Sequence, residues 1–382
     1  MDIVTVIVIG FLLLTLVFIN IFAKPSYTNY IVLFIIIIVL SLFSAFRSAE
    51  IPDTQPYIEN YEYWAKDIQS NGFFHYTSIM EIGFEFFAKI CIILKLNYTA
   101  FFFVISLIQS FLFISIERKI SNRYVLLAFA LFYSFYGIYF QFIILRAGIS
   151  TLLFFYAIFK CKNKYSRFLT FGLAFTFHYS ALFGIILYYI FSKINLKVTF
   201  NLTVCSIILF IPIYILGVNK IIIDALAGLL SGPGSSTMLF YNKIYFYMVN
   251  YGDVSYKLPF RLIVNSLIFL WSLYMIEKYK IRRNKKINIL INVTYVAVIV
   301  ILLFGSAVPI LRLSDFVMLS NVFLVIYIIS RLKLRNINTL CLYKTDVRGN
   351  KVIVYNKLCI SLLIMIFALC NLGFVYRITL NV

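Results

Sequence analysis

Charged side chains are scarce in this 382-residue sequence: 13% of the residues are Asp, Glu, Lys or Arg, whereas 63% are hydrophobic. A typical soluble domain is about 45–50% apolar and about 25% charged. A soluble core cannot bury so much apolar surface, so we expect lipid to be the surrounding solvent. The composition therefore argues against an ordinary soluble enzyme and leaves no room for a large soluble domain.

Residues that bind metals are also few. The sequence has two His and six Cys, and the cysteines are scattered, mostly within apolar runs, without a CxxC spacing. We interpret them as small packing residues rather than as disulfides or metal ligands. With so few histidines, we expect no zinc or haem site and no other cofactor.

Acidic residues are the rarer charge, with 14 Asp and Glu against 34 Lys and Arg, and the formal net charge is +20. The basic residues lie in short clusters between apolar runs, which is typical of the cytoplasmic loops of membrane proteins. No RRM, zinc-finger or basic-helix pattern accompanies them, so we expect no binding to nucleic acid.

Apolar runs long enough to cross a bilayer, roughly 17–25 residues, recur along the whole chain. They begin near residues 3, 29, 98, 124, 143, 168, 198, 260, 287, 311 and 357. They predict an all-α polytopic protein of about 11 transmembrane helices (roughly 10–12), in a single membrane domain over residues 1–382. The first run has no basic n-region and no cleavage site, so we expect an uncleaved transmembrane helix.

The positions of Lys and Arg predict which loops share a side of the membrane. The basic clusters, including the loop 331–356, are expected in the cytoplasm. The acidic segment 47–81 and the long segment 218–258 are then outer loops. In two places the number of apolar runs does not agree with the predicted sides of the flanking loops. The short run 80–96 would be interfacial or re-entrant, and the run around His178 either turns back there or breaks the charge rule.

Ionisable residues in or beside apolar runs are costly in a membrane and are therefore functional candidates. The candidates lie near the predicted outer face: Arg47 with Asp53 and Tyr57; Glu81 with Glu85 and Lys89; Arg146; His178; Arg312 with Asp315; and, less strongly, Arg261. Each also has a purely structural interpretation, such as a snorkelling arginine, an ion pair on one helix face or a histidine bonded to the backbone. The set as a whole favours a functional site.

Arginine is the commonest charge in this set, which indicates an anionic ligand. The guanidinium group binds phosphate oxygens in pairs, and several arginines around one anion suit a diphosphate. A diphosphate held among membrane helices at the outer face suggests a polyisoprenyl-diphosphate lipid. An Asp, Glu or His could then act as general base on an incoming hydroxyl. The set therefore predicts glycosyl transfer in which arginines, rather than a metal ion, stabilise the leaving group.

The same residues resemble the EpsG-like and Wzy-type bacterial polysaccharide polymerases, over roughly residues 30–190. The matching pieces are Arg47 followed by Asp53 and Tyr57, Glu81-Ile82-Gly83-Phe84, Arg146-Ala147-Gly148 and Phe177-His178-Tyr179-Ser180-Ala181-Leu182. Two features depart from the family pattern. Ile51 and Pro52 precede Asp53 where a glycine is common, and the element around Arg312 matches only loosely.

The resemblance implies a GT-C-like membrane glycosyltransferase in the bacterial inner membrane. Such an enzyme transfers undecaprenyl-diphosphate-linked oligosaccharide chains onto new lipid-linked repeat units at the periplasmic face, in the synthesis of O-antigen, capsule or exopolysaccharide. Its implied partners are the lipid-linked oligosaccharide, membrane lipid, and the chain-length regulator and flippase of the same pathway.

The polymerase hypothesis predicts roles for the site residues. These are Arg47, Arg146 and Arg312 for the diphosphate; Asp53 or His178 as the base, with Glu81 positioning the sugar or the base; and Tyr57 and Asp315 for the sugar. The alternatives are a flippase or transporter of the same lipid-linked oligosaccharide, an O-antigen ligase, and a membrane acyltransferase. A transporter would need charged residues along a two-sided pathway, and such proteins often carry an inverted repeat that this sequence does not show.

Overall fold

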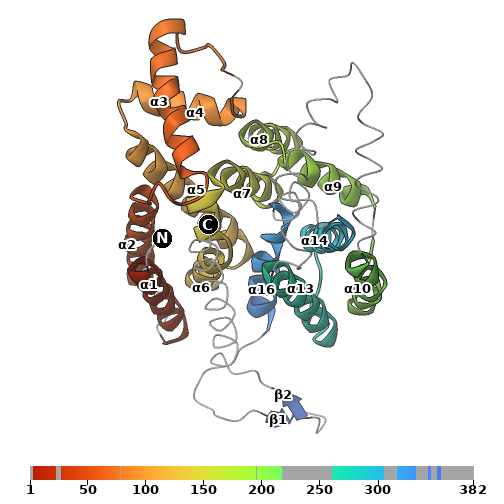
Figure 1. The fold of residues 1–382 in the computed structure, drawn as a ribbon. Coiled ribbons are helices and arrows are strands. Elements are labelled where there is room, and N and C mark those ends of the chain that lie inside the picture. The colour runs from red at the N-terminus through yellow and green to blue at the C-terminus, as the bar shows by residue number, and fades with distance from the viewer. Residues whose placement is uncertain are drawn as a thin grey trace, which may run out of the picture. The chain divides into compact units, whose positions relative to one another are not determined.

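The chain is predominantly helical (Figure 1). The structure, a computed structural model, describes residues 3–22, 27–77, 79–194, 196–216, 260–304, 316–332, 343–345 and 351–353. Within these ranges the only strands are β1 (Tyr343–Thr345) and β2 (Lys351–Ile353), which pair antiparallel. Apart from this hairpin, the expected all-α class is confirmed for the described residues.

The contacts of the chain divide it into two compact units. The first comprises Met1–Ala181 and Ile326–Val382, and the second comprises Leu182–Val325. Arg47, Tyr57, Glu81, Arg146 and His178 all lie in the first unit, which is therefore the one that carries the candidate site.

The first unit contains α1 (Ile3–Phe22), α2 (Tyr27–Ala45), α3 (Thr54–Asn71), α4 (Ile82–Ile93), α5 (Tyr98–Ile120), α6 (Val125–Phe132), α7 (Leu145–Phe159) and α8 (Lys164–Phe177). A 3-10 turn, η1 (Asn122–Tyr124), precedes α6, and two π-helical segments, η2 (Tyr133–Gly137) and η3 (Tyr139–Ile143), follow it. Helix α7 packs on both α5 and α8, α2 packs on α5, and α4 packs on both α3 and α8.

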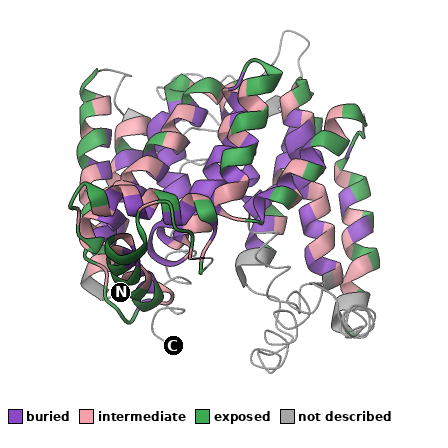
Figure 2. Ribbon diagram, turned by 90° about the horizontal axis from the view of Figure 1, so that it is seen from above, coloured by how far each residue is buried: buried purple, intermediate pink, exposed green. Residues whose placement is uncertain are grey.

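The core of this unit is built from aromatic side chains. Every residue of α6 is buried, as are most residues of α7. Figure 2 colours the described residues by burial, with the buried ones in purple. Phe113 of α5 stacks on Phe132 of α6 with 4.2 Å between ring centroids. By contrast, Phe11 of α1 and Leu169 of α8 are each 69% exposed. Large apolar side chains that the protein leaves uncovered are expected where lipid is the solvent.

The second unit contains most of α9 (Ala181–Lys193), α10 (Phe200–Ile215), α13 (Phe260–Lys278), α14 (Lys285–Phe304) and the start of α16 (Ser320–Arg331). Helix α10 packs on both α13 and α14. A buried amide contact adds to the packing, because Asn321 Nδ2 donates to the carbonyl oxygen of Asn265 at 3.0 Å.

Three described helices are long and apolar enough to cross a membrane: Tyr27–Ala45, Tyr98–Ile120 and Lys285–Leu303. Five shorter apolar helices accompany them among the described residues. The helices start close to the predicted runs, but the count of about 11 spans, the GT-C-like architecture and the assignment of sides stay predictions. The segment 218–258, most of 331–356 and the run near residue 357 lie outside the described residues.

The segment 47–81, expected to be an outer loop, contains the 18-residue helix α3. Its composition is polar, but Tyr57, Tyr61 and Trp64 recur at helical spacing and are buried. The short run 80–96 forms the 12-residue helix α4, which at about 1.5 Å per residue is too short to cross a bilayer. Its interfacial or re-entrant position stays a prediction.

The run around His178 is broken at that residue. Helix α8 ends at Phe177, His178 follows it in an extended conformation with φ −162° and ψ 129°, and α9 begins at Ala181. The helical run is therefore interrupted at His178, and a re-entrant path for it stays a prediction. Each flanking helix has 14 residues or fewer, about 21 Å at most, which is shorter than the hydrocarbon thickness of about 30 Å.

Candidate functional site

Glu81 is the centre of the candidate site. It precedes α4, and its Oε1 lies 2.6 Å from Nδ1 of His178. Its other oxygen, Oε2, forms an ion pair with Nη1 of Arg146. The Glu81 side chain is 6% exposed, whereas those of Arg146 and His178 are 27% and 25% exposed. Three residues that the sequence analysis selected separately therefore meet at one carboxylate.

Tyr57 of α3 is close to both arginines of the site. Its hydroxyl accepts a long hydrogen bond of 3.5 Å from Nε of Arg146. The guanidinium carbons of Arg146 and Arg47 lie 5.9 and 6.0 Å from the centroid of its ring, which is within cation–π range. The ring is buried and packs on Phe84 at 5.6 Å. Both cations therefore lie near one ring, and we call Arg47, Tyr57, Glu81, Arg146 and His178 the Glu81 site.

One nitrogen of the Arg47 guanidinium group has hydrogen-bond acceptors, and the other two have none among the described residues. Its Nη1 donates to the carbonyl oxygens of Gln141 at 2.8 Å and of Phe142 at 3.1 Å. Its Nε and Nη2 are buried and have no hydrogen-bond partner among the described residues. Burial lowers the pKa of Arg47 to about 9, although Tyr57 and Asp53 raise it, so the side chain stays cationic near neutral pH. Buried donors without an acceptor are costly, and an anionic ligand would relieve that cost.

The carbonyl groups that hold Arg47 come from the π-helical segment η3. The chain leaves helical geometry at Ile144, with φ −106° and ψ 61°, before α7 begins. Gln141 lies at the centre of this contact: its carbonyl oxygen also accepts from Ser44 at 2.7 Å, and its side-chain amide donates to Ser110 at 3.0 Å. Irregular helical turns of this kind are frequent at functional sites, and this one links Arg47 to the start of α7.

Two glycines allow the helices of the site to approach closely. A Cβ on Gly83 would lie 2.8 Å from Cβ and 2.9 Å from the carbonyl carbon of Thr176 in α8. A Cβ on Gly148 would lie 2.7 Å from Cβ of Phe140 and 2.8 Å from Nε2 of Gln109. Each glycine follows an ionisable site residue by two positions, so the close approach also fixes where Glu81 and Arg146 lie.

Asp53 lies next to the site in an unusual backbone conformation. It has φ 65° and ψ −5° immediately before α3, a left-handed conformation that Asp adopts more readily than most residues. Its charge raises the pKa of Arg47. In this chain the residue with the left-handed conformation is Asp53 itself. The two residues before it are Ile51 and Pro52, where the family pattern commonly has a glycine. A role for Asp53 as base stays a prediction.

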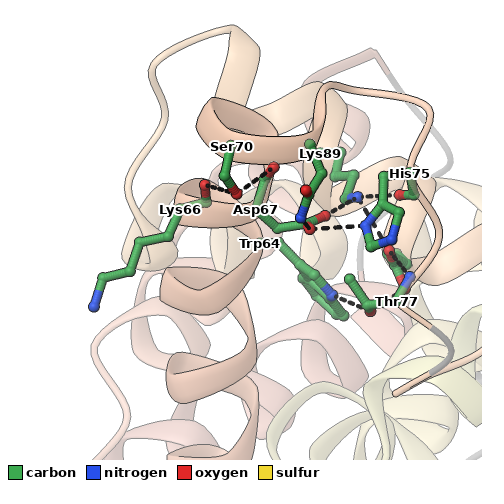
Figure 3. Close-up of polar contacts among 9 residues, drawn as sticks. Trp64, Lys66, Asp67, Ser70, His75, Thr77 and Lys89 are labelled. Carbon is green, nitrogen blue, oxygen red and sulfur yellow. Dashed lines mark hydrogen bonds and ion pairs between the residues drawn. The ribbon is translucent and has the colours of Figure 1, made fainter.

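Other candidates are placed elsewhere. Glu85 and Lys89, expected on one helix face with Glu81, do pair with each other at 3.2 Å. They belong to a separate buried cluster with Asp67 and His75 (Figure 3), two residues that the sequence analysis did not select. Arg312 and Asp315 lie outside the described residues, as does the side chain of Arg261, so their roles are untested.

The carboxylate of Glu81 is held in its charged form. Burial alone would raise its pKa, but the hydrogen bond from His178 and the charge of Arg146 lower it from 4.5 to about 2. A carboxylate whose pKa is lower in the folded than in the unfolded protein stabilises the fold at pH values above its unfolded-state pKa. This stabilisation is lost as the pH falls through the folded-state pKa. At neutral pH the shift corresponds to about 3 kcal/mol.

Glu81→Gln is expected to lower the stability of the purified protein at pH 7, because the neutral amide cannot pair with Arg146. The difference from the unsubstituted protein should shrink as the pH falls from 4.5 towards 2, where Glu81 itself becomes neutral. Thermal unfolding in detergent at a series of pH values measures this. A difference that is the same at pH 7 and pH 3 would contradict the ion-pair account.

These features define a polytopic helical membrane protein with a buried, charged site in its N-terminal half. The family model of the EpsG family matches residues 30–346. The chain therefore belongs to the EpsG family, a family of Wzy-like polysaccharide polymerases and exopolysaccharide biosynthesis proteins. The match confirms the resemblance and extends it well beyond residue 190. No curated protein and no solved structure matched the chain.

Proposed function

We propose that the chain is a repeat-unit polymerase that transfers undecaprenyl-diphosphate-linked oligosaccharide onto a new lipid-linked repeat unit at the periplasmic face of the inner membrane. The observation that supports this best is the Glu81 site, in which a carboxylate-bound imidazole lies near two arginines that share Tyr57. Membership of the EpsG family supports polysaccharide synthesis as its setting.

His178 is the residue best arranged to act as base. When its Nδ1–H donates to Glu81, Nε2 is the nitrogen that can accept a proton, and the carboxylate stabilises the imidazolium that results. In the proposed step, Nε2 takes the proton of the acceptor hydroxyl as its oxygen attacks the anomeric carbon of the donor sugar. The bond from that carbon to the diphosphate oxygen breaks, and undecaprenyl diphosphate leaves. Asp53 is the alternative base.

Arg47 is the principal diphosphate ligand in this proposal, because its Nε and Nη2 have no acceptor among the described residues. Arg146 is shared, since it pairs with Glu81 through Nη1 and contacts Tyr57 through Nε. Two cations beside the leaving group would stabilise the charge that develops on the diphosphate. Arg312 and Asp315 are proposed to contribute from the segment outside the described residues. Catalysis is proposed to need no metal ion.

The test is elongation by the purified protein in proteoliposomes, with lipid-linked repeat units extracted from cells as the substrate. The unsubstituted protein is expected to give a ladder of products that differ by one repeat unit, unchanged by EDTA. His178→Ala should reduce the rate at least about a hundredfold, since a general base typically contributes that much or more. Tyr165→Ala, at the exposed start of α8, is the matched control and should elongate normally.

The alternatives predict different products in the same assay. A flippase would move the lipid-linked units across the bilayer and give no ladder. A ligase would transfer finished polymer to another acceptor without elongating it. Either result from a correctly folded protein would overturn the proposed polymerase. Normal elongation by both single variants, His178→Ala and Asp53→Asn, would overturn the proposed base.

A further inference from the structure

Three exposed side chains follow one another in the segment that joins α3 to α4. Phe74 is 89% exposed and Tyr76 is 39% exposed, and the side chain of His75 between them is 46% exposed. We call Phe74, His75 and Tyr76 the aromatic triplet.

A buried ion cluster fixes the backbone at His75. Lys89 of α4 forms ion pairs with Asp67 at 2.7 Å and with Glu85 at 3.2 Å, and its ammonium group also donates to the carbonyl oxygen of His75 (Figure 3). The side chains of Lys89, Asp67 and Glu85 are 2% exposed or less. A buried lysine with these acceptors holds its position firmly, because any displacement would leave a charge unpaired in the interior.

Thr77 fixes the backbone on the other side of the triplet. Its amide nitrogen donates to Oε1 of Glu85 at 2.9 Å, and its hydroxyl donates to Oε2 at 2.7 Å. The same hydroxyl accepts a hydrogen bond of 3.0 Å from the indole of Trp64. The segment is therefore anchored to a buried cluster at residues 75 and 77, on either side of Tyr76.

His75 repeats the arrangement of His178. The sequence contains two histidines, and each bonds through Nδ1 to a carboxylate that also pairs with a cation. For His75 the carboxylate is Asp67, at 2.8 Å, and the cation is Lys89. Hydrogen bonds from Asn71, Lys89 and His75 lower the pKa of Asp67 to about 2, so the carboxylate is ionised and accepts from Nδ1–H. Nε2 is then left as a hydrogen-bond acceptor on a ring that is partly exposed.

The triplet also lies close to the Glu81 site. The hydroxyl of Tyr76 donates to the carbonyl oxygen of Met80 at 2.6 Å, one residue before Glu81. Burial, the neighbouring phenol of Tyr179 and the carboxylates of Glu85 and Glu81 together raise the pKa of Tyr76 to about 12. Tyr179 is the residue after His178. The triplet and the proposed base therefore share one region of the surface.

We propose that the aromatic triplet binds a saccharide unit of the lipid-linked oligosaccharide, with the rings of Phe74 and Tyr76 against the sugar and Nε2 of His75 accepting from a sugar hydroxyl. This inference rests on the proposed function, because it places the oligosaccharide beside Glu81. Aromatic rings suit the C–H face of a sugar, and a tyrosine adds a polar group. Aromatic residues can also anchor a protein at the membrane interface, but an anchor would not need a histidine fixed to buried charges.

The inference is tested by measuring saccharide binding directly. The probe is the water-soluble oligosaccharide repeat unit released by mild acid from extracted lipid-linked units. The chain has two tryptophans, so Trp271→Phe leaves Trp64, which contacts Thr77, as a fluorescent reporter beside the triplet. Calorimetric titration gives an independent affinity. His75→Ala is expected to weaken binding at least tenfold, whereas Tyr165→Ala, which removes a ring that is 84% exposed elsewhere, should leave it unchanged.

Phe74→Ala keeps the test decisive if His75→Ala fails to fold, because the Phe74 side chain is almost fully exposed. Unchanged saccharide affinity in the folded variants would overturn the inference and would indicate a membrane anchor instead. If the protein elongates but the triplet variants bind normally, this inference alone fails. If saccharide binding depends on His75 but no ladder forms, the proposed polymerase fails instead.

Discussion

Arg146→Ala is expected to stop the synthesis of long chains while single lipid-linked repeat units persist. The substitution removes the cation that pairs with Glu81 and contacts Tyr57, and with it part of the proposed diphosphate site. Removal of one group that stabilises developing charge typically costs about 10²–10³ in rate, so we expect at least a hundredfold loss. Gel analysis of cell-surface polysaccharide and the elongation rate in proteoliposomes both measure it.

A loss of folding could give the same result, because the substitution leaves the buried Glu81 carboxylate without its cation, and breaking a buried pair in this way costs about 3–5 kcal/mol. The double variant Glu81→Gln with Arg146→Ala removes both charges and should recover much of the thermal stability without recovering elongation. Arg123→Ala, at an exposed arginine beyond α5, is the matched control. Normal chain length in a stably folded Arg146→Ala protein would exclude Arg146 from the site.

Gly83→Ala is expected to cost as much activity as the loss of a charged residue. The added methyl group would lie 2.8 Å from Cβ and 2.9 Å from the carbonyl carbon of Thr176, so α4 must move away from α8. Glu81 precedes α4 and His178 follows α8, so their hydrogen bond would lengthen. A displacement of about 1 Å at a catalytic group can cost a hundredfold in rate, and overpacking costs about 1–3 kcal/mol of stability.

Gly172→Ala provides the matched control for this prediction. Gly172 lies in α8, and a Cβ there meets no heavy atom within 4 Å, so alanine should be tolerated and should stabilise the helix by roughly 0.5–1 kcal/mol. Thr176→Gly in the Gly83→Ala protein removes the side-chain part of the clash and should restore part of the elongation rate. Full activity in the Gly83→Ala protein alone would show that the helices adapt without moving Glu81.

The sequence predicted the helices and the main members of the site, because both depend on local chemistry. A long apolar run must form a helix in lipid, and α5 and α14 begin close to the predicted positions. A charge beside such a run is costly enough to be conspicuous, which is why Glu81, Arg146 and His178 could be selected separately. That they meet at one carboxylate required the tertiary structure.

The remaining features depend on packing that the sequence does not reveal. Helix α3 is polar, so a search for apolar runs passed over it, although the spacing of Tyr57, Tyr61 and Trp64 would have indicated it. An ion pair on one helix face was the structural interpretation of Glu85 and Lys89, and this pair is present. The pair of Lys89 with Asp67 requires α3 and α4 to pack together. The carbonyl groups that hold Arg47 come from η3, and no residue type marks a π-helix.

The π-helical segments also make the site sensitive to the length of the chain. A π-helical turn amounts to an extra residue within an α-helix, and each residue of an α-helix turns the chain by about 100°. Deleting one residue from η2 would therefore rotate η3, which carries the carbonyl groups that hold Arg47, relative to α6 without changing any site residue. Because Gln141 holds Arg47 and α7 carries Arg146, the two cations would lose their common alignment on Tyr57. In homologous chains, an insertion or deletion in this short stretch would thus alter the geometry of the site as much as a substitution within it.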